Sequence, residues 1–358
     1  MRRKYVWWVC ILLVAFAATG PLNALQQPVE LTLITHDSFS VSEEVLSSFE
    51  QEAGIRVRIL RAGDTGTMIN QAILSRNNPL ADVLYGLDNT FLTRALDADL
   101  FVPYESPLLK DVAEEFILDS QHRVTPIDYG DVCLNYDKAY FAEHDLLLPA
   151  SFEDLTKPEY RGLLVVENPA TSSPGLAFLL ATIGYFGTGN EEEEIQPYTY
   201  LDFWADLVAN DVLVVDSWSD AYYGEFSATG DGTRPLVVSY ASSPPAEVYF
   251  AEEELEDAPT GSITASGMCF RQIEFAGILA GTQRIEAAQR FIDFLLSRPF
   301  QEDMPLQMFV FPVNREAELP EVFARYAAIP EEPAYLDSET IAAYREEWIE
   351  AWTSVVLR

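Results

Sequence analysis

The chain has 358 residues, a length that corresponds to about two domains of ordinary size. Hydrophobic residues make up 49% of it and aromatic residues 12%, a composition that excludes a chain disordered throughout. The formal net charge of −35 excludes nucleic acid as the expected partner, because phosphate binding needs a basic surface, and it favours the attraction of cations instead.

The N-terminus has the layout of a secretory signal peptide. Residues 1–4 include two arginines and a lysine, residues 6–18 are apolar and uncharged, and small or turn-forming residues follow over 19–24. The apolar run is too short to span a bilayer comfortably as a permanent helix. We therefore expect a signal peptide over 1–24, with an uncleaved anchor as the alternative, and a mature protein in the periplasm or outside the cell.

The first elements of the mature chain alternate between strand and helix patterns. Ser42 is placed to cap a helix that Gly54 ends. The succession predicts an α/β domain with a largely parallel sheet, in which ligands gather beyond the carboxyl ends of the strands. The expected strands cover 29–35, 55–60 and 81–85, a second helix covers 67–75, and the candidate ligand loops are 35–39, 62–67 and 86–89.

A second α/β segment follows, and the chain then returns to strand and helix patterns before it ends in helices. We find no internal repeat and no low-complexity linker, so the domains are expected to be joined by short strand crossings. Strands are expected over 133–136, 163–166, 212–215, 236–239 and 268–275, and helices over 175–185, 198–210, 284–296 and 341–356.

Motifs for catalysis or for a tightly bound cofactor do not stand out. The three histidines, His36, His122 and His144, have no metal-ligand spacing. There is no nucleophile elbow, phosphate loop or dinucleotide fingerprint. We therefore expect no catalytic residue, no cofactor and no resident metal.

Several segments that follow strands instead combine aromatic rings, carboxylates and hydroxyls. Residues 217–223 bring tryptophan, tyrosine and aspartate together, and 239–244 add Tyr240. An aromatic cation needs this set, with rings for stacking and an acid for its charge. The segment 168–175 places hydroxyls at a helix start, which favours an anion such as phosphate.

At these residues the chain resembles the thiamine-binding subfamily of periplasmic binding proteins, the receptors of ABC-type thiamine importers. The resemblance spans most of the mature chain, from about Leu31 to the C-terminal helix. It is carried by Asp37-Ser38-Phe39, by Ala81-Asp82-Val83 with Gly86-Leu87-Asp88-Asn89, by Asp128-Tyr129-Gly130 with Tyr136-Asp137-Lys138, by residues 171–176, by residues 218–222, and by Ser239-Tyr240 with Ser243-Pro244.

The resemblance implies a type II periplasmic-binding-protein fold, in which two α/β lobes joined by hinge strands close on a ligand. It implies an ABC importer's membrane subunits as the partner, and we expect a monomer. The first lobe would comprise 28–130 with 270–312, and the second 131–269. Residues 313–358 would form a C-terminal helical segment that packs on the lobes.

The resemblance also implies a ligand set for thiamine or a thiamine phosphate. Trp218, Tyr240 and Phe309 would stack on the rings. Two positions depart from the pattern of the family, because Phe309 is usually Trp and Ala246 is usually Tyr. The remaining ligand-binding candidates are Asp37 and Asp88 for the cation or the aminopyrimidine, their neighbours Ser38 and Asn89, the hydroxyls of Thr171, Ser172 and Ser173 for a phosphate, and Tyr222.

The resemblance suggests a pairing for the cysteines as well. Cys10 lies in the expected signal peptide, which leaves Cys133 and Cys269, and an exported protein permits a disulfide between them. In the implied fold these two cysteines lie on hinge strands that run side by side. We therefore predict a Cys133–Cys269 disulfide.

Three alternatives remain open at this point. Tyr222 and Tyr223 resemble the phenolate pair of ferric-ion-binding relatives of the same fold, which would make them metal ligands. A polyamine also needs acids and rings. A secreted enzyme of thiamine chemistry on the same scaffold would need a nucleophile or an acid/base pair in the cleft.

Overall fold

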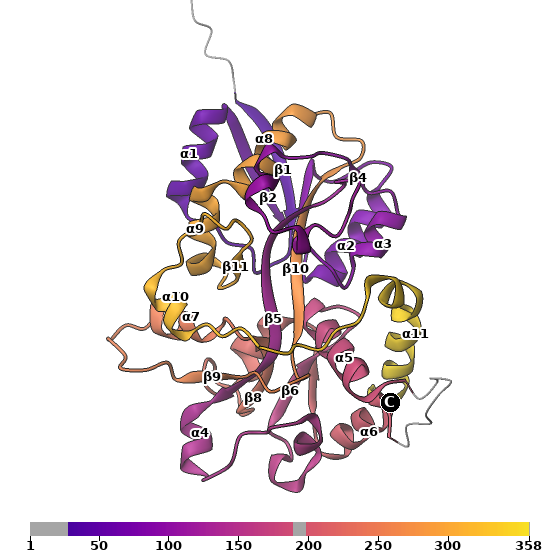
Figure 1. The fold of residues 1–358 in the computed structure, drawn as a ribbon, viewed down its shortest axis with the longest axis vertical. Helices are drawn as coiled ribbons and strands as arrows, with labels where there is room; N and C mark the ends of the chain where they lie inside the picture. Colours follow the sequence, from indigo (N-terminus) through magenta and orange to yellow (C-terminus); the bar gives the residue numbers. More distant parts are fainter. Residues whose placement is uncertain (1–27, 189–197, 358) are drawn as a thin grey trace, which may run out of the picture.

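A computed structural model describes residues 28–188 and 198–357, so the expected signal peptide lies outside the described residues. Figure 1 shows two lobes, one above the other, with strands β5 and β10 passing between them. The strands are β1 Val29–Thr35, β2 Ile55–Arg61, β3 Val83–Asp88, β4 Phe101–Val102, β5 Thr125–Asp137, β6 Leu164–Glu167, β7 Leu213–Val215, β8 Leu236–Tyr240, β9 Thr260–Ile263, β10 Phe270–Leu279 and β11 Phe311–Pro312. The α-helices are α1 Glu43–Ala53, α2 Thr65–Ser75, α3 Leu92–Asp97, α4 Lys138–Glu143, α5 Ser173–Phe186, α6 Tyr200–Ala209, α7 Pro244–Tyr249, α8 Ile285–Leu296, α9 Arg298–Gln307, α10 Glu321–Tyr326 and α11 Ser338–Val356.

The strands pair in the order β2-β1-β3-β10-β5-β8-β6-β7, with β4, β9 and β11 attached beside this path. Strand β1 is parallel to β2 and β3, and β6 is parallel to β7 and β8. Strands β10 and β5 are antiparallel to each other and to β3 and β8, respectively. Two parallel blocks are thus joined through a central antiparallel pair, and this pair forms the hinge between the lobes.

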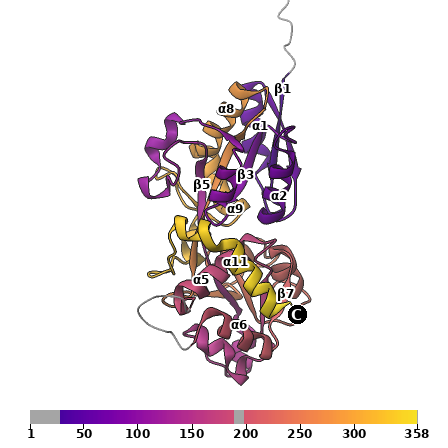
Figure 2. The ribbon, with the colours of Figure 1, turned by 90° about the vertical axis from the view of Figure 1, so that its right-hand side faces the viewer.

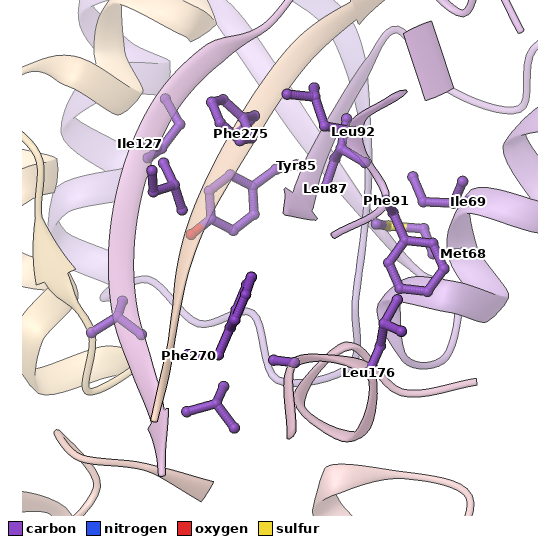
Figure 3. Close-up of a cluster of buried hydrophobic side chains, with 14 of the residues drawn as sticks. Met68, Ile69, Tyr85, Leu87, Phe91, Leu92, Ile127, Leu176, Phe270 and Phe275 are labelled. Atoms are coloured by element: carbon purple, nitrogen blue, oxygen red, sulfur yellow. The ribbon is translucent and has the colours of Figure 1, made fainter. Parts of the chain in front are cut away.

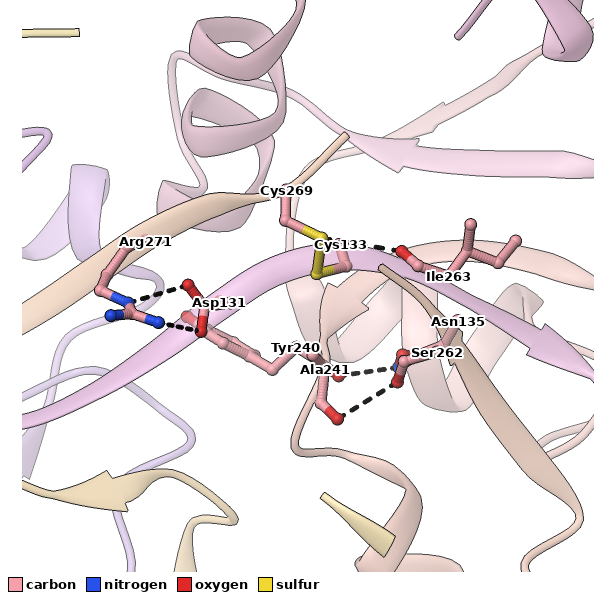
Figure 4. The surroundings of a disulfide bond; sticks show 9 residues. All are labelled: Asp131, Cys133, Asn135, Tyr240, Ala241, Ser262, Ile263, Cys269 and Arg271. Carbon is pink, nitrogen blue, oxygen red and sulfur yellow. Dashed lines mark hydrogen bonds and ion pairs between the residues drawn. A yellow bond between two sulfur atoms is a disulfide. The ribbon is translucent and has the colours of Figure 1, made fainter. Parts of the chain in front are cut away.

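The hinge carries the predicted disulfide. Cys133 lies within β5 and Cys269 directly precedes β10, with 4.4 Å between their Cα atoms, and the two sulfurs are bonded. Figure 4 shows the bond between the two strands, next to the ion pair in which the Arg271 guanidinium donates to both carboxylate oxygens of Asp131 at 2.9 Å. The prediction of this disulfide is confirmed. The expected strand 268–275 starts two residues later, so Cys269 is just outside it.

Helix α1 forms for the reasons visible in the sequence. The Ser42 hydroxyl accepts a hydrogen bond from the Val45 amide at 3.3 Å, which satisfies one of the free donors of the first turn. Phe49 is the buried residue of this helix. Gly54 adopts φ 65°, a conformation that costs glycine little, and it ends the helix before β2 begins.

The hydrophobic core is continuous across both lobes and the hinge. Figure 3 shows side chains from distant parts of the chain that meet beside β5 and β10. Tyr85 comes from β3, Met68 from α2 and Leu176 from α5, and all three side chains are buried. The lobes therefore share apolar contacts in addition to the hinge strands.

The C-terminal helix α11 contacts both lobes, and Figure 2 shows it lying across their junction. Trp352 packs edge-on against Trp204 of α6, with ring centroids 5.4 Å apart. The guanidinium of Arg345 lies 4.8 Å from the ring centroid of Phe91, just before α3. Within residues 28–188 and 198–357, no helix combines the length and the apolar character that a membrane crossing requires.

Candidate functional site

A cavity of about 320 Å³ lies between the lobes. The first lobe supplies the turns after β1 and β2, the second lobe supplies the segments after β7 and β8, and the hinge strand β10 supplies Glu274. The lining residues are His36, Asp37, Ser38, Asp64, Thr65, Ser173, Pro174, Trp218, Ser219, Tyr222, Tyr223, Tyr240, Ser243, Ala246, Phe250, Glu274, Gln307, Met308, Phe309 and Val310.

An aromatic wall forms the side of the cavity that belongs to the second lobe. The rings of Trp218 and Tyr222 are stacked, with centroids 5.0 Å apart and planes 16° apart. The Trp218 indole N–H donates to the hydroxyl of Ser239 at 3.0 Å, which fixes the orientation of the indole. Residues 220–225 form a π-helical turn, a local widening found frequently at functional sites.

Tyr240 extends this wall at the hinge. Its hydroxyl donates to the side-chain oxygen of Gln272 at 2.8 Å. The ring lies against Gly130 of β5, where a Cβ atom would come within 2.7 Å of the ring. Glycine at position 130 therefore allows the ring to lie flat on the hinge strand.

Carboxylates face the aromatic wall. Asp37 and Asp64 come from the first lobe and Glu274 from the hinge, and the twenty lining residues include no lysine or arginine. His36 Nε2 lies 3.4 Å from Glu274 Oε2. Burial acts to lower the pKa of His36, but the carboxylates of Glu274, Asp64 and Asp37 together outweigh burial and the pKa is raised overall. The field in the cavity is therefore one that attracts a cation.

A second acidic group lies buried behind Glu274. The Tyr85 hydroxyl donates to Asp128 of β5, and both side chains are inaccessible to solvent. Burial and the nearby Glu274 raise the pKa of Asp128 well above its usual range. This environment favours the neutral form of the Asp128 carboxyl, which is hydrogen-bonded to the Tyr85 hydroxyl.

The two lobes touch at the rim of the cavity. The backbone N–H of Trp218 donates to Asp64 Oδ2 at 3.2 Å, and Asp64 also accepts from the Thr65 amide at the start of α2. A Cβ atom on Gly66 would lie 2.8 Å from the carbonyl oxygen of Thr171 in the opposite lobe. The absence of a side chain at Gly66 thus allows the lobes to approach this closely.

Seven of the eleven side chains predicted to bind ligand line this cavity. They come from both lobes, although they are separated by up to 272 positions in the sequence. Tyr223, named only for the ferric alternative, lines it too. The seven are Asp37, Ser38, Ser173, Trp218, Tyr222, Tyr240 and Phe309.

Asp88 and Asn89 do not line the cavity, because the expected loop 86–89 is the end of β3. The Asp88 carboxylate accepts from the amide and the hydroxyl of Thr90 and is fully buried, and this burial raises its pKa to about 6. The Asn89 side chain is hydrogen-bonded to the backbone of Arg271 and Ile273 in β10. The Asn89 side chain therefore ties the end of β3 to the hinge strand, while the Asp88 carboxylate holds the turn that follows β3.

Thr171 and Ser172 also lie outside the cavity lining. The Thr171 hydroxyl donates to the carbonyl oxygen of Asp216 at 2.8 Å, so it ties its loop to the segment after β7. The Ser172 side chain is fully buried at the base of α5. Of the predicted phosphate-binding hydroxyls, only Ser173 reaches the cavity.

Several residues that line the cavity were not predicted from the sequence. Asp64 lies in the expected ligand loop 62–67 but was not singled out. Glu274 lies in an expected strand between the apolar residues Ile273 and Phe275. This alternation could have indicated that its side chain points to the other face of the sheet. Phe250 follows α7 with its side chain 66% exposed, and its ring centroid is 5.6 Å from that of Phe309 across the cleft.

The tyrosine pair of the ferric alternative takes part in other contacts. The rings of Tyr222 and Tyr223 are perpendicular, at 88°. The Tyr222 hydroxyl donates to Glu247 at 2.9 Å, and burial together with this carboxylate raises its pKa well above 10. Among the described residues, no group of three or more His, Cys, Asp or Glu side chains is arranged to hold a metal ion.

Comparison with known proteins places the chain in a family. The profile of the family described as bacterial extracellular solute-binding protein matches residues 78–329, well over half of the chain. The thiamine-binding periplasmic proteins of Salmonella typhimurium and Escherichia coli are each 28% identical to it, over 94% and 95% of this chain and 95% and 96% of theirs. A solved periplasmic thiamin binding protein superposes with a TM-score of 0.79 at 26% identity, and the match covers 92% of this chain and 97% of that chain.

These similarities confirm what the resemblance implied about the fold and the location. The solved structure extends over nearly the whole chain and has the two-lobed architecture of type II periplasmic binding proteins. The relatives are periplasmic, and the family is extracellular, in agreement with the expected export. From the matched residues 78–329, the chain belongs to the family of bacterial extracellular solute-binding proteins.

Proposed function

We propose that this protein is the thiamine-binding receptor of an ABC-type importer and that it holds its ligand in the cavity between the lobes. Two relatives that match nearly the full length of the chain carry the name thiamine-binding periplasmic protein. Their names support the choice of ligand. The residues of the cavity supply the physical reason.

The observation that carries the proposal is the pairing of an aromatic wall with carboxylates in one cavity. Trp218 stacks on Tyr222, and three acids line the same cavity without any lysine or arginine. Thiamine has two aromatic rings, one of which carries a permanent positive charge. Aromatic faces bind such a ring by stacking and cation–π attraction, and buried carboxylates compensate its charge.

The lining residues can be given roles on this basis. Trp218, Tyr240 and Phe309 provide ring faces, while Asp64 and Glu274 lie where they compensate the thiazolium charge. Asp37 with its neighbour Ser38 offers acceptors to the aminopyrimidine. Tyr222 supports Trp218 from behind, since its own hydroxyl is used by Glu247. Ala246 leaves room that Phe250 and Phe309 fill at the rim.

Delivery to the membrane follows from the two-lobed design. We place the first lobe at 28–130 with 270–312 and the second at 131–269, with 313–358 packed on both. Closure about β5 and β10 would present the rims of both lobes to the membrane subunits of the importer, with the receptor acting as a monomer. The disulfide at the hinge limits separation of the two strands without occupying the cavity.

Calorimetric titration of the purified mature protein with thiamine tests the proposal. We expect saturable binding in a one-to-one ratio at micromolar ligand or below, together with quenching of tryptophan fluorescence. Spermidine and ferric citrate serve as competitors for the polyamine and ferric alternatives, and neither is expected to displace thiamine. Thiamine recovered intact after prolonged incubation would argue against turnover. Absence of thiamine binding at micromolar concentrations, with binding of either competitor, would overturn the proposal.

A further inference from the structure

One basic side chain belongs to the wall of the cavity. Among the twenty residues that line the cavity, His36 alone has a side chain that can carry a positive charge near neutral pH. It directly follows β1, and its Nε2 atom lies 3.4 Å from Oε2 of Glu274 in the hinge strand β10. Only 13% of the His36 side chain and 12% of the Glu274 side chain are exposed. The two groups therefore form an imidazole–carboxylate pair that is largely shielded from solvent.

The strand β3 fixes the position of this imidazole. Gly86 of β3 has φ 97°, and a Cβ atom there would collide with a ring carbon of His36. The ring of Tyr85, also in β3, lies 5.9 Å from the imidazole, measured between centroids. Glycine at position 86 thus leaves the space in which His36 lies against β3 and meets Glu274.

Carboxylates approach His36 from three segments of the chain. Glu274 belongs to β10, Asp64 precedes α2, and Asp37 is the next residue after His36. Burial acts to lower the pKa of His36, and the three carboxylates more than offset burial, so the pKa is raised above its usual value of 6.5. The phenol of Tyr85 stays uncharged, because burial raises its pKa well above 10. Without a ligand, the imidazolium form of His36 is therefore favoured.

Glu274 has further acids beside it in the sheet. It lies opposite Asp128 of β5 and opposite Asp88 of β3, and both of these side chains are buried. Burial raises the pKa of both acids, and Glu274 raises it further. Within residues 28–188 and 198–357, the ion pair that Glu274 forms is the one with His36. A cation that enters the cavity and the imidazolium of His36 therefore compete for the same carboxylate.

From this competition we infer that ligand binding is coupled to loss of a proton: the thiamine cation takes over the charge of Glu274, and His36 gives up one ring proton to the solvent. The inference rests on the proposed function. Two positive charges beside one carboxylate repel each other, and only the charge of the imidazolium can be removed. Thiamine affinity should therefore rise with pH through the range in which unliganded His36 loses its proton, and it should level off above that range.

Calorimetric titration with thiamine in phosphate and in Tris, two buffers with different ionisation enthalpies, counts the protons released. For a coupling of about tenfold, we expect at most about half a proton released per thiamine near pH 7, and an affinity that rises about fivefold between pH 6 and pH 8. In His36→Gln, which keeps a neutral polar side chain, proton release should vanish and affinity should vary less than twofold over this range. His144→Gln is the matched control, because His144 is exposed and lies outside the cavity lining, and it should release protons as the unmodified protein does.

Nuclear magnetic resonance measures the same coupling in the unmodified protein. The chain has three histidines, so the His36 signal can be assigned by substitution of His122 and His144. Because the coupling is reciprocal, saturation with thiamine should lower the proton affinity of His36 by the same factor of about ten. Titration of thiamine itself is common to all variants and cancels in their comparison. Unchanged proton affinity of His36, or proton release that persists in His36→Gln, would overturn this inference and leave the proposed function intact. Absence of thiamine binding would overturn both.

Discussion

The two segments after the parallel strands β6 and β7 appear equivalent in sequence but serve different purposes. Both leave the same end of the sheet, and both carry hydroxyl groups of the kind that bind ligands. The segment 217–223 turns its large side chains into the cavity, where Trp218 and Tyr222 form the wall. The segment 168–175 uses its polar groups on its own backbone and on the neighbouring segment, and contributes only Ser173 and Pro174.

The difference shows what decides whether a polar residue after a strand is available to a ligand. A short hydroxyl side chain near a backbone turn finds a backbone partner, as Thr171 does in the carbonyl oxygens of Asn168 in its own turn and of Asp216 in the neighbouring segment. A large aromatic ring gains little from hydrogen bonds to the nearby backbone, and it is stabilised mainly by packing against other rings. Aromatic residues therefore identify a cavity wall more dependably than serine and threonine do.

Removal of the Trp218 ring should have the largest effect on binding. Trp218→Ala deletes a ring face and the support it shares with Tyr222, and we expect a loss of about 2–3 kcal/mol in thiamine binding free energy, or about 30-fold to 150-fold in Kd. Trp218→Phe keeps a ring, so its thiamine affinity should lie between those of Trp218→Ala and of the unmodified protein. Tyr335→Ala, a matched deletion of a ring that is 81% exposed and outside the cavity, should bind normally. A Trp218→Ala protein that folds and binds within threefold of normal would disprove the aromatic-wall assignment.

A substitution in the first lobe, at its contact with the segment 168–175, should have a smaller effect on thiamine binding. An alanine at Gly66 would place its Cβ 2.8 Å from the Thr171 carbonyl oxygen, so closure would require a shift of backbone. We expect Gly66→Ala to weaken thiamine binding by about 1–3 kcal/mol, the usual cost of overpacking. Thermal stability of the unliganded protein should not fall, since alanine is the better helix former within α2.

Gly224→Ala is the control for this substitution, because a Cβ at position 224 meets nothing within 4 Å. It changes the same residue type in the opposite lobe, within the turn that follows β7. Calorimetry with both variants, beside thermal unfolding without ligand, separates a defect in closure from a defect in folding. Equal affinities for the two variants would mean that the approach of Gly66 to Thr171 is not needed for binding.

The fold was largely predictable from the sequence because its signals are local. The Ser42 cap, the Gly54 stop and the β-branched strands are set by neighbouring residues, and they mark α1, β1 and β2 closely. The disulfide followed from the resemblance, since no local pattern indicates that β5 and β10 are adjacent. The order of the strands across the hinge depends on contacts between residues more than a hundred positions apart.

The site was predictable only in part, because burial within the site is not a local property. Asp88 reads as a loop residue after an apolar run, but the strand continues through it and covers its carboxylate. Glu274 has the pattern of an ordinary strand residue, but it lies at the point where β10 lines the cavity between the lobes. The position of Thr171 outside the cavity lining could not be predicted, because the Asp216 carbonyl that accepts its hydrogen bond lies 45 positions away.

Substitution of Thr171 should have the smallest effect on binding. Thr171→Val keeps the shape of the side chain and removes the hydroxyl that donates to the Asp216 carbonyl oxygen. We expect the free energy of unfolding, measured in urea, to fall by about 1 kcal/mol, the usual net value of one hydrogen bond. Thiamine affinity should stay within twofold, because the hydroxyl belongs to the connection between the two segments and not to the cavity lining. A tenfold loss of affinity with unchanged stability would reverse this assignment, and it would make the two segments after β6 and β7 equal contributors to the ligand.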